Sequence, residues 1–413
     1  MVAGSPNGFP RAFVVGAVLV GLVVRLAFGL WYWNGQALTR DELEYLSLAR
    51  SLAAGHGFVY DEVLRAGSFT PFGRSPGYPA FLALIGAGSR VFTSAPTAVK
   101  VAQSFVGAIG VWLAAIVAFR VGGTRAARAG AAIAAVYPPL VWIAAFVWSE
   151  SIFWPLGLFI AWLFDRAVAR GGRALGGFVC GVVVGLAIIT RPAIILFLPL
   201  AGIYLIWKRH PRMLAAMAVG VLLVYLPWTA RNYLFHGRVM VVASDGGVTF
   251  WTGNHPLAIG EGDMAANSAL KLDNQRLRAK HPGLTEEEME HFYYEEAFSW
   301  MRAHPLAWMT LELKKAFYLV VPIGPSYTLH SVRYFVTSVV SYGTLLGLGF
   351  VAIARRRFRL GDAAGVWLLA GSAVLVCLVF FPQERFRIPL IDPALVVLGG
   401  LGIATLFPST SRP

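Results

Sequence analysis

The sequence has little charge, almost no cysteine and no stretch in which apolar and polar residues alternate. Charged residues make up 14% of its 413 residues and hydrophobic residues 57%, and the mean hydropathy is +0.64. A soluble domain carries about 25% charged residues. The shortage of charge therefore excludes a soluble domain of this size, and the lack of alternation excludes a transmembrane β-barrel.

Metal-binding and nucleotide-binding patterns are also missing. The two cysteines, Cys180 and Cys377, lie inside apolar runs, so the chain has neither a disulfide framework nor a zinc-binding cysteine set. The histidines show no ligand spacing, and neither a GxGxxG pattern nor a P-loop occurs. These absences argue against cysteine chemistry and against a soluble nucleotide as a ligand.

The sequence is rich in long apolar runs. Runs of roughly 18 to 20 residues cross the hydrocarbon core of a membrane as helices. The first run follows Arg11 like a signal peptide, but it is too long and has no small-residue cleavage site. We expect an all-α polytopic membrane protein with about ten transmembrane helices, which are residues 12–32, 97–119, 129–147, 151–168, 174–190, 193–207, 212–228, 331–354, 363–381 and 388–407.

The net charge of +14 lies in basic clusters between the apolar runs. This is the positive-inside pattern of cytoplasmic segments, and we expect no nucleic-acid partner. Of the 21 acidic residues only Asp165 and Asp362 fall on the cytoplasmic side of this assignment. We therefore expect a multi-pass plasma membrane protein, in a bacterium of the inner membrane, with both termini cytoplasmic. The clusters are Arg120/Arg125/Arg128, Arg166/Arg170/Arg173, Lys208/Arg209/Arg212 and Arg355/Arg356/Arg357/Arg359.

Two long external loops, residues 33–96 and 229–330, interrupt the spans of what we take to be one membrane domain, 1–413, without a large soluble domain. Within them the apolar stretches 77–92 and 306–321 are expected to lie along the membrane surface. Loops of this length in a compact domain tend to be functional. Further helices are expected at 40–54 and, opened by Thr285 as a cap, at the acidic run 286–290.

A carboxylate pair, Asp41 and Glu42, follows the first span. Helical spacing puts Asp41 beside Tyr45 and turns Glu42 away by about 100°. One carboxylate can then face a catalytic cavity while the other orients it. The alternative is an acidic pair that the helix dipole favours at a helix start.

Arg74 stands just ahead of the segment Pro76-Gly77-Tyr78-Pro79, at the expected level of the lipid headgroups. Its planar guanidinium matches the oxygens of a lipid phosphate. The alternative is an arginine that reaches to the headgroups without a specific ligand.

Two short external turns carry charges that need an explanation. Glu150 lies in a tight turn between two spans, either as a buried functional carboxylate or as a helix-start residue beside the cap Ser149. Arg385 and Arg387 lie on the side that the positive-inside tendency disfavours. They indicate an anionic ligand, unless they only pair with Glu384.

Weaker candidates end a span or lie in the second loop. Arg231 ends a span, and Asp245 and Asn254 lie beside glycines that permit close backbone approach, although an ordinary turn is the better explanation. Arg25 and Arg191 are more often structural at such positions, and we assign them no role.

The order of these short motifs and their shared external side resemble the GT-C superfamily of membrane glycosyltransferases. The likeness is to the branch of protein O-mannosyltransferases and aminoarabinose transferases. The resemblance is spread over most of the chain. It rests on Asp41-Glu42-x-x-Tyr45, Gly55-x-Gly57, Arg74-x-Pro76-x-Tyr78-Pro79, Ser149-Glu150, Pro227-Trp228-x-x-Arg231-Asn232, Gly253-Asn254 and Arg385-x-Arg387-x-Pro389.

The resemblance implies sugar transfer from a polyprenyl-phosphate donor to a hydroxyl of a lipid, glycan or protein acceptor, on the periplasmic or extracellular face. Asp41 would be the general base and Glu150 the second acidic residue. Arg74, with Arg385 and Arg387, would bind the lipid phosphate. In-line attack by the acceptor would invert the configuration at the anomeric carbon. Glu42 is a further catalytic candidate, and Tyr45, Tyr78, Arg231 and Asn254 are candidate substrate-binding residues.

No cofactor is expected: related enzymes with two acidic motifs hold a divalent metal, but metal-independent transfer is favoured. The chain departs from the family in having Arg instead of Lys at position 74 and in lacking a sizeable C-terminal soluble domain, which leaves the acceptor and the sugar open. A transporter or flippase of lipid-linked sugars is an alternative, which predicts charged residues near the bilayer midplane. A non-enzymatic assembly subunit is another.

Overall fold

The computed structural model describes residues 8–61, 64, 73–237, 246–262, 264–326, 331–355 and 360–407, and this part of the chain is almost entirely helical. The predicted all-α fold class is confirmed. The helices are α1 (Arg11–Ala27), α2 (Arg40–Ala53), α4 (Gly77–Leu84), α5 (Thr97–Val136), α6 (Pro138–Trp142), α7 (Glu150–Ala169), α8 (Ala174–Thr190), α9 (Phe197–Trp207), α10 (Pro211–His236), α11 (Gly246–Gly253), α12 (Ser268–Lys280), α13 (Glu286–Ala303), α14 (Pro305–Val320), α15 (Val332–Ala354), α16 (Ala364–Val379), α17 (Glu384–Arg387) and α18 (Ile391–Leu406).

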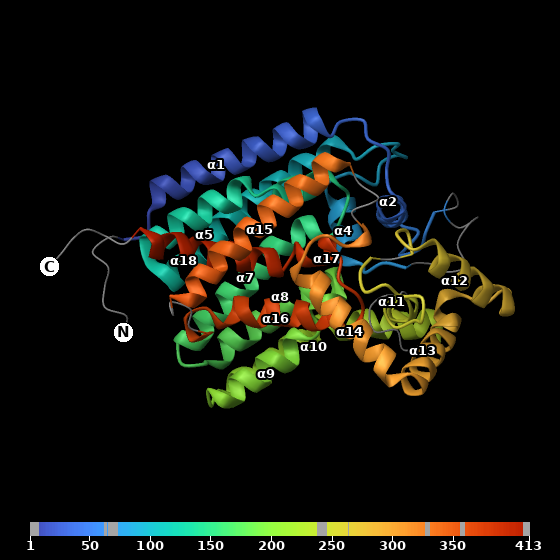
Figure 1. Ribbon diagram of the computed structural model, residues 1–413. Coiled ribbons are helices and arrows are strands. Elements are labelled where there is room, and N and C mark those ends of the chain that lie inside the picture. The colour runs from blue at the N-terminus through green and yellow to red at the C-terminus, as the bar shows by residue number, and fades with distance from the viewer. Residues whose placement is uncertain are drawn as a thin grey trace.

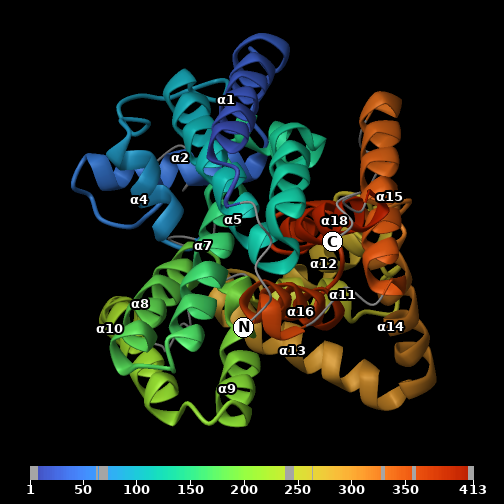
Figure 2. The same ribbon diagram turned by 90° about the vertical axis from the view of Figure 1, so that its left-hand side faces the viewer.

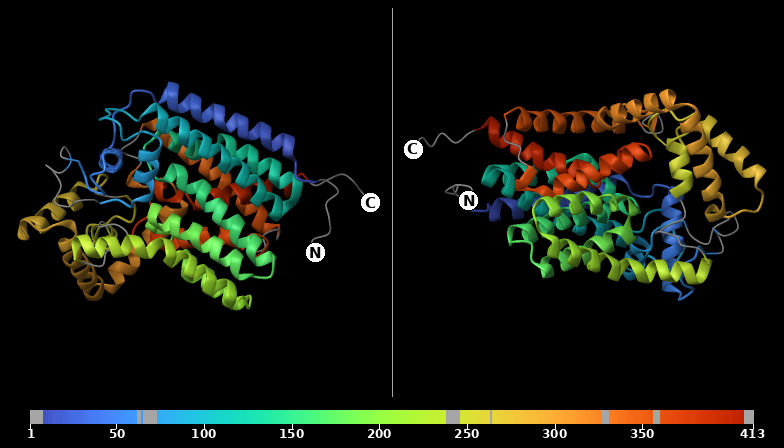
Figure 3. Two further views of the ribbon diagram at one scale, coloured as in Figure 1. Left: turned by 180° about the vertical axis from the view of Figure 1, so that it is seen from behind. Right: turned by 90° about the horizontal axis from the view of Figure 1, so that it is seen from below.

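The long apolar helices lie side by side in one bundle (Figure 1). The start of α1 and the end of α18 lie at one end of this bundle, whereas α2 and α11 to α13 lie at the other, as the view from behind also shows (Figure 3). Figure 2 looks at the end with the termini and shows α8, α9 and α10 grouped on one side and α15 on the other. The described residues include five helices long and apolar enough to cross a membrane, Arg11–Tyr32, Thr97–Val136, Glu150–Ala169, Pro211–Phe235 and Val332–Ala354, and shorter apolar helices at Ala174–Thr190, Pro192–Trp207, Ala364–Val379 and Ile391–Leu406.

Helix α5 is a hairpin of two helical halves that fold back on each other. A glycine pair separates the halves, and Gly123 has φ +69°, a conformation that favours glycine. Close packing joins the halves, since a Cβ on Gly130 would lie 2.9 Å from the Ala118 side chain. The halves correspond to two of the predicted spans. The second half ends at Val136 because two prolines follow, earlier than the predicted end at residue 147.

The described part of the first long loop contains two helices, α2 and α4, that pack on each other. α2 corresponds to the amphipathic helix expected at 40–54, while α4 covers only the first half of the stretch 77–92. Leu46 of α2 and Tyr78 of α4 are fully buried in one apolar cluster. This packing holds the start of α2, where Asp41 lies, close to the segment before α4.

The described part of the second long loop has its own apolar cluster. Trp251 of α11 and Tyr293 of α13 are fully buried in it. The predicted cap is present, since Thr285 accepts a hydrogen bond from the Glu288 N–H at 3.3 Å. Asp245, Arg356, Arg357 and Arg359, which the sequence analysis singled out, lie outside the described residues.

Candidate active site

Asp41 lies in the first turn of α2 between two arginines from distant parts of the chain. Arg74 donates a hydrogen bond to one of its carboxylate oxygens, and Arg385 donates to the other. Burial raises the pKa of Asp41, but the charges of Arg74 and Arg385 outweigh it and hold the pKa well below its usual value. Asp41 is therefore ionised at neutral pH.

A capping box fixes Asp41 at this place. The Glu42 Oε2 atom accepts from the Thr39 N–H at 2.8 Å and from the Thr39 hydroxyl at 2.9 Å. The Glu42 Oε1 atom accepts from the buried Val147 N–H at 2.8 Å. Both oxygens of Glu42 thus hold the start of α2 against the segment after α6, and they turn away from Asp41 as the helical spacing predicts.

Arg74 holds a second carboxylate besides Asp41. Its Nε donates to Glu44 Oε2 at 2.8 Å, and Glu44 also accepts from Arg40 at 3.1 Å. The guanidinium lies over the Tyr45 ring, 5.6 Å from the ring centre. Arg74 is therefore oriented by three residues of α2 that lie on neighbouring turns.

Glu150, the first residue of α7, is completely buried and paired with two arginines. Arg191 Nη1 lies 2.8 Å from Glu150 Oε1 and also donates to Ser149 Oγ at 3.2 Å. Arg385 donates to Glu150 as well as to Asp41, with its guanidinium 4.2 Å from the centre of the Trp148 ring. Arg385 therefore bridges the two carboxylates that the sequence singled out.

Six side chains make up this carboxylate–arginine cluster, with three formal charges of each sign. Sequence reasoning identified four of them and missed Glu44 and Arg191. Arg191 carried the same signal as Arg385, because it follows α8 on the side that the positive-inside tendency disfavours. The members are Asp41, Glu44, Arg74, Glu150, Arg191 and Arg385.

Tyr45 and Tyr78 pack under the cluster. Their rings meet edge to face with centres 4.8 Å apart. The Tyr45 hydroxyl lies 3.2 Å from Ser149 Oγ, and the Tyr78 hydroxyl donates to Gln103 at 2.6 Å. Burial raises the pKa of both phenols, so both stay neutral. Tyr45 borders the cluster, whereas Tyr78 lies behind it.

The other candidate residues have their contacts elsewhere. Arg387 donates from Nε to Asp392 at 2.7 Å. Asn254 accepts from the buried Lys315 at 3.2 Å and donates to the Val379 carbonyl at 2.9 Å. Arg231 donates to the neighbouring Asn232 at 3.1 Å and lies over the Trp228 ring. These contacts connect the three residues to other parts of the fold than Asp41.

Within the described part of the chain, no three or more histidine, cysteine, aspartate or glutamate side chains gather in the way a metal site requires. Asp41 and Glu150, two of the three acidic candidates, both pair with Arg385.

Comparison with solved structures finds the same fold in membrane glycosyltransferases. ArnT from Cupriavidus metallidurans, bound to undecaprenyl phosphate, is similar with a TM-score of 0.52 and 17% identity over 95% of this chain and 59% of ArnT. The apo oligosaccharyltransferase of Archaeoglobus fulgidus is similar with a TM-score of 0.56 and 13% identity over 96% of this chain and 51% of that protein. The Archaeoglobus fulgidus oligosaccharyltransferase AglB, in complex with an inhibitory peptide and a dolichol-phosphate, is similar with a TM-score of 0.53 and 14% identity. The match covers 97% of this chain and 51% of AglB.

These likenesses confirm the resemblance: the chain has the fold of the GT-C membrane glycosyltransferases. It spans between about half and three-fifths of the length of these proteins. Residues 74–231, which include Arg74, Glu150 and Arg191, match the family model described as dolichyl-phosphate-mannose-protein mannosyltransferase. No curated protein matches the chain.

Proposed function

We propose that the chain is a glycosyltransferase that moves a sugar from a polyprenyl-phosphate donor to an acceptor hydroxyl, with inversion, at the external end of its helix bundle. The observation that carries this proposal is the position of Asp41 between Arg74 and Arg385. A general base and a site for an anionic leaving group are both needed for this transfer, and here they lie side by side.

The transfer proceeds by in-line displacement. The acceptor oxygen forms a bond to the anomeric carbon while its proton passes to Asp41. The bond from the anomeric carbon to the phosphate oxygen breaks, and its electron pair leaves with the polyprenyl phosphate. Arg74 and Arg385 stabilise the charge that develops on the phosphate, a contribution worth on the order of 100-fold in rate for one such donor.

The same two arginines couple donor binding to the basicity of Asp41. While they contact Asp41, they neutralise its carboxylate and lower its pKa. A donor phosphate competes for their N–H groups, because guanidinium binds phosphate and carboxylate in the same fork geometry. Once the arginines turn to phosphate, Asp41 loses part of its neutralising charge, and its pKa rises towards the value of a useful base.

Glu150 and Arg191 complete the cluster as positioning residues. The carboxylate of Glu150 is completely buried and accepts from Arg385, so it holds that arginine in reach of the phosphate. Arg191 neutralises Glu150 from the other side. Glu42 acts through the helix start that carries Asp41 and is likewise proposed as a positioning residue.

We place this site on the periplasmic or extracellular side of a plasma membrane, the inner membrane in a bacterium. Support comes from the basic clusters of the sequence and from the position of α2, which lies at the end of the bundle opposite the start of α1 and the end of α18 (Figure 1). The undecaprenyl phosphate of ArnT and the dolichol-phosphate of AglB support a lipid-linked donor. The acceptor is a lipid, a glycan or a protein.

The function is tested with purified protein in liposomes, a panel of polyprenyl-phosphate sugars and a native membrane extract as acceptor source. We expect release of free polyprenyl phosphate from one donor, dependent on the extract, and a sugar-labelled product. If no donor is consumed while labelled lipid moves between leaflets, the chain is a flippase and the transferase proposal is wrong.

A further inference from the structure

The arginine that bridges Asp41 and Glu150, Arg385, is carried by α17, a helix of four residues. A helix of one turn has little stability of its own, so its neighbours must hold it in place. In a helix, Glu384 and Arg387 share one face, while Arg385 points away from both by about 100° or more. Contacts on the first face can therefore fix α17 without touching the ligands of Arg385.

A buried aspartate at the start of α18, Asp392, holds Arg387. Its Oδ1 atom accepts from Arg387 Nε at 2.7 Å, and its Oδ2 atom accepts from the Tyr137 hydroxyl at 2.9 Å. Arg387 and Tyr137 are buried, and Asp392 is completely so. Tyr137 lies between α5 and α6, far from Asp392 in the sequence. One oxygen of this carboxylate is thus occupied by α17 and the other by a distant part of the bundle.

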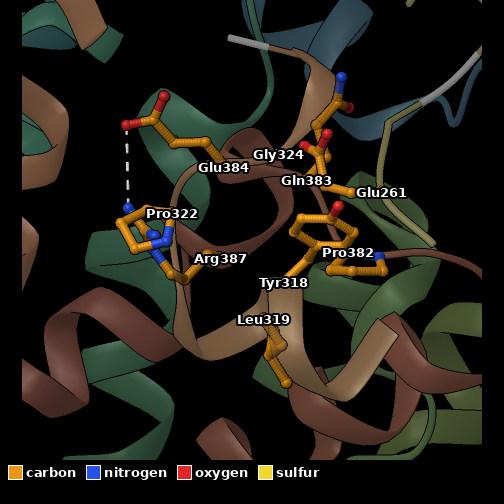
Figure 4. Close-up of a pocket in the computed structure, with 9 residues that line it drawn as sticks. All are labelled: Glu261, Tyr318, Leu319, Pro322, Gly324, Pro382, Gln383, Glu384 and Arg387. Carbon is orange, nitrogen blue, oxygen red and sulfur yellow. Dashed lines mark ion pairs between the residues drawn. The ribbon is translucent and has the colours of Figure 1, made fainter. Parts of the chain in front are cut away.

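Helix α15 packs on the same face of α17. The Arg387 guanidinium lies 3.4 Å from the centre of the Tyr342 ring. The Tyr334 hydroxyl donates to Glu384 Oε2. Glu384 Oε1 lies 3.8 Å from Arg387 Nη2, and Figure 4 marks this ion pair with a dashed line. One face of α17 is therefore fixed to α15, to α18 and to the corner between α5 and α6.

The charge of Asp392 determines where α17 can lie. When one partner of a buried ion pair is removed, the other charge stays uncompensated, which is strongly unfavourable. Without Asp392, the nearest carboxylate to Arg387 is that of Glu384, at 3.8 Å, and closer pairing requires α17 to shift. Because α17 is one turn long, such a shift also displaces Arg385 from its carboxylates.

We propose that Asp392 is a positioning residue for the proposed sugar transfer. It fixes Arg387 and, through α17, keeps Arg385 in reach of the donor phosphate. The inference rests on the proposed function only for the phosphate as a ligand of Arg385. It assigns Arg387 to the support of α17 and separates it from the arginines that meet the phosphate.

The first part of the test measures hydrogen exchange of backbone amides in the full-length protein, in nanodiscs without added polyprenyl phosphate. Asp392→Asn keeps the shape of the side chain and removes its charge. We expect exchange about ten-fold faster in residues 384–390 and unchanged exchange in the rest of the bundle. Unchanged exchange in residues 384–390 would show the proposal to be wrong, whether or not the protein binds lipid or transfers sugar.

Asp165→Asn is the matched control. Asp165 is likewise a buried carboxylate, and it accepts from the Gly365 N–H at 2.9 Å. It lies near the end of α7 that is far from Glu150. Its loss should lower the thermal midpoint and leave the exchange of residues 384–390 and the binding of polyprenyl phosphate as in wild type.

The second part measures binding of polyprenyl phosphate to wild type, Asp392→Asn, Arg385→Lys and the double variant. A residue that acts through Arg385 loses its effect once Arg385 is changed. We expect Asp392→Asn to weaken binding about ten-fold in wild type and less than about two-fold in the Arg385→Lys protein. Equal losses in both backgrounds, or no loss in a folded Asp392→Asn protein, would overturn the proposal.

Two further outcomes are distinguishable. If Arg385→Lys itself binds polyprenyl phosphate like wild type, the proposed role of Arg385 in the transfer is wrong, and the exchange data still decide whether Asp392 holds α17. If thermal melting shows that Asp392→Asn is unfolded, Tyr137→Phe takes its place in both parts. This variant removes one of the two contacts of Asp392, so the same pattern is expected with smaller changes, and its absence would contradict the proposal.

Discussion

At the scale of single residues, the state of Asp41 depends on what Arg74 and Arg385 bind. Both arginines donate to Asp41, and while they do so the carboxylate is a weak base. A base that is released only when a phosphate occupies the arginines would not be active before the donor is in place. This coupling has a measurable consequence for the pH dependence of the reaction.

The pH below which the rate falls is expected to differ between kcat/KM, which reports the free protein, and kcat, which reports the donor-bound protein. The contacts with Arg74 and Arg385 lower the pKa of Asp41. Since kcat/KM reports the protein before the donor binds, kcat/KM for the donor should keep its value well below the usual titration range of an aspartate. When phosphate takes the arginines the pKa rises, so kcat should fall at higher pH than kcat/KM does. Steady-state rates across pH 3 to 8 (roughly the range around the usual aspartate pKa) check this. Acid limbs at the same pH would contradict the coupling.

Arg385→Lys is expected to weaken both contacts of the bridge between Asp41 and Glu150. An ammonium cannot reproduce the planar fork that binds two carboxylates or a phosphate. We expect about 10- to 100-fold weaker binding of polyprenyl phosphate, measured in nanodiscs, because charged hydrogen bonds contribute about 1.5 to 3 kcal/mol each. Arg276→Lys, at an exposed pair on α12, is the matched control. Unchanged lipid binding in Arg385→Lys would place the phosphate elsewhere.

The residues of the cluster differ in how far the sequence reveals them. Asp41, Arg74, Glu150 and Arg385 lie in short patterns at the ends of apolar runs, and the structure brings them together. Arg191 also follows an apolar run, but nothing in the sequence near it points to its partner Glu150, which lies on another helix. Such pairings arise from packing between helices and are not encoded in local spacing.

At the scale of elements, α2 depends on the capping box at its first turn. Glu42→Ala removes the cap contact to Thr39 and leaves the buried Val147 N–H without its acceptor. The expected loss is about 1 to 3 kcal/mol of stability, seen as a lower thermal midpoint in detergent.

The same variant should retain part of its activity at low temperature, because Glu42 holds the helix and does not touch the reacting atoms in our proposal. Glu295→Ala, at an exposed position of α13, should leave the midpoint unchanged. A Glu42→Ala protein of normal stability without turnover would instead make Glu42 a catalytic residue, as the sequence analysis expected.

The helices themselves are well predicted by apolar runs, and their ends are not. The two halves of α5 were expected as separate spans, but the second stops at Val136, where prolines interrupt it. α4 ends at Leu84 although the apolar pattern continues to residue 92. Hydropathy reports where a helix can lie in lipid, whereas proline, glycine and packing decide where it ends.

At the scale of the whole molecule, the shortage of charge and the long apolar runs without alternation predicted an all-helical membrane protein. The order of the motifs predicted the GT-C fold, which the solved structures confirm. The sugar and the acceptor were not predictable, because a binding pocket is formed by side chains that only the packing of separate helices brings together.

The orientation of the bundle is testable by labelling. Single cysteines at Ser89 and Lys208, two exposed positions, are introduced after Cys180 and Cys377 are changed to alanine. We expect a membrane-impermeant maleimide to label Ser89→Cys on intact spheroplasts and Lys208→Cys only after permeabilisation, because the positive-inside tendency puts Lys208 in the cytoplasm. The reverse pattern would place the carboxylate–arginine cluster on the cytoplasmic side.

The most direct test of Asp41 as the general base is the single-turnover release of polyprenyl phosphate by wild type, Asp41→Asn and Asp61→Asn. Asp61 is the matched control, since it lies in the same loop and pairs with Arg50. We expect Asp41→Asn to be slower by roughly 100- to 10,000-fold while Asp61→Asn keeps the wild-type rate. A folded Asp41→Asn protein that releases polyprenyl phosphate at the wild-type rate would contradict the mechanism.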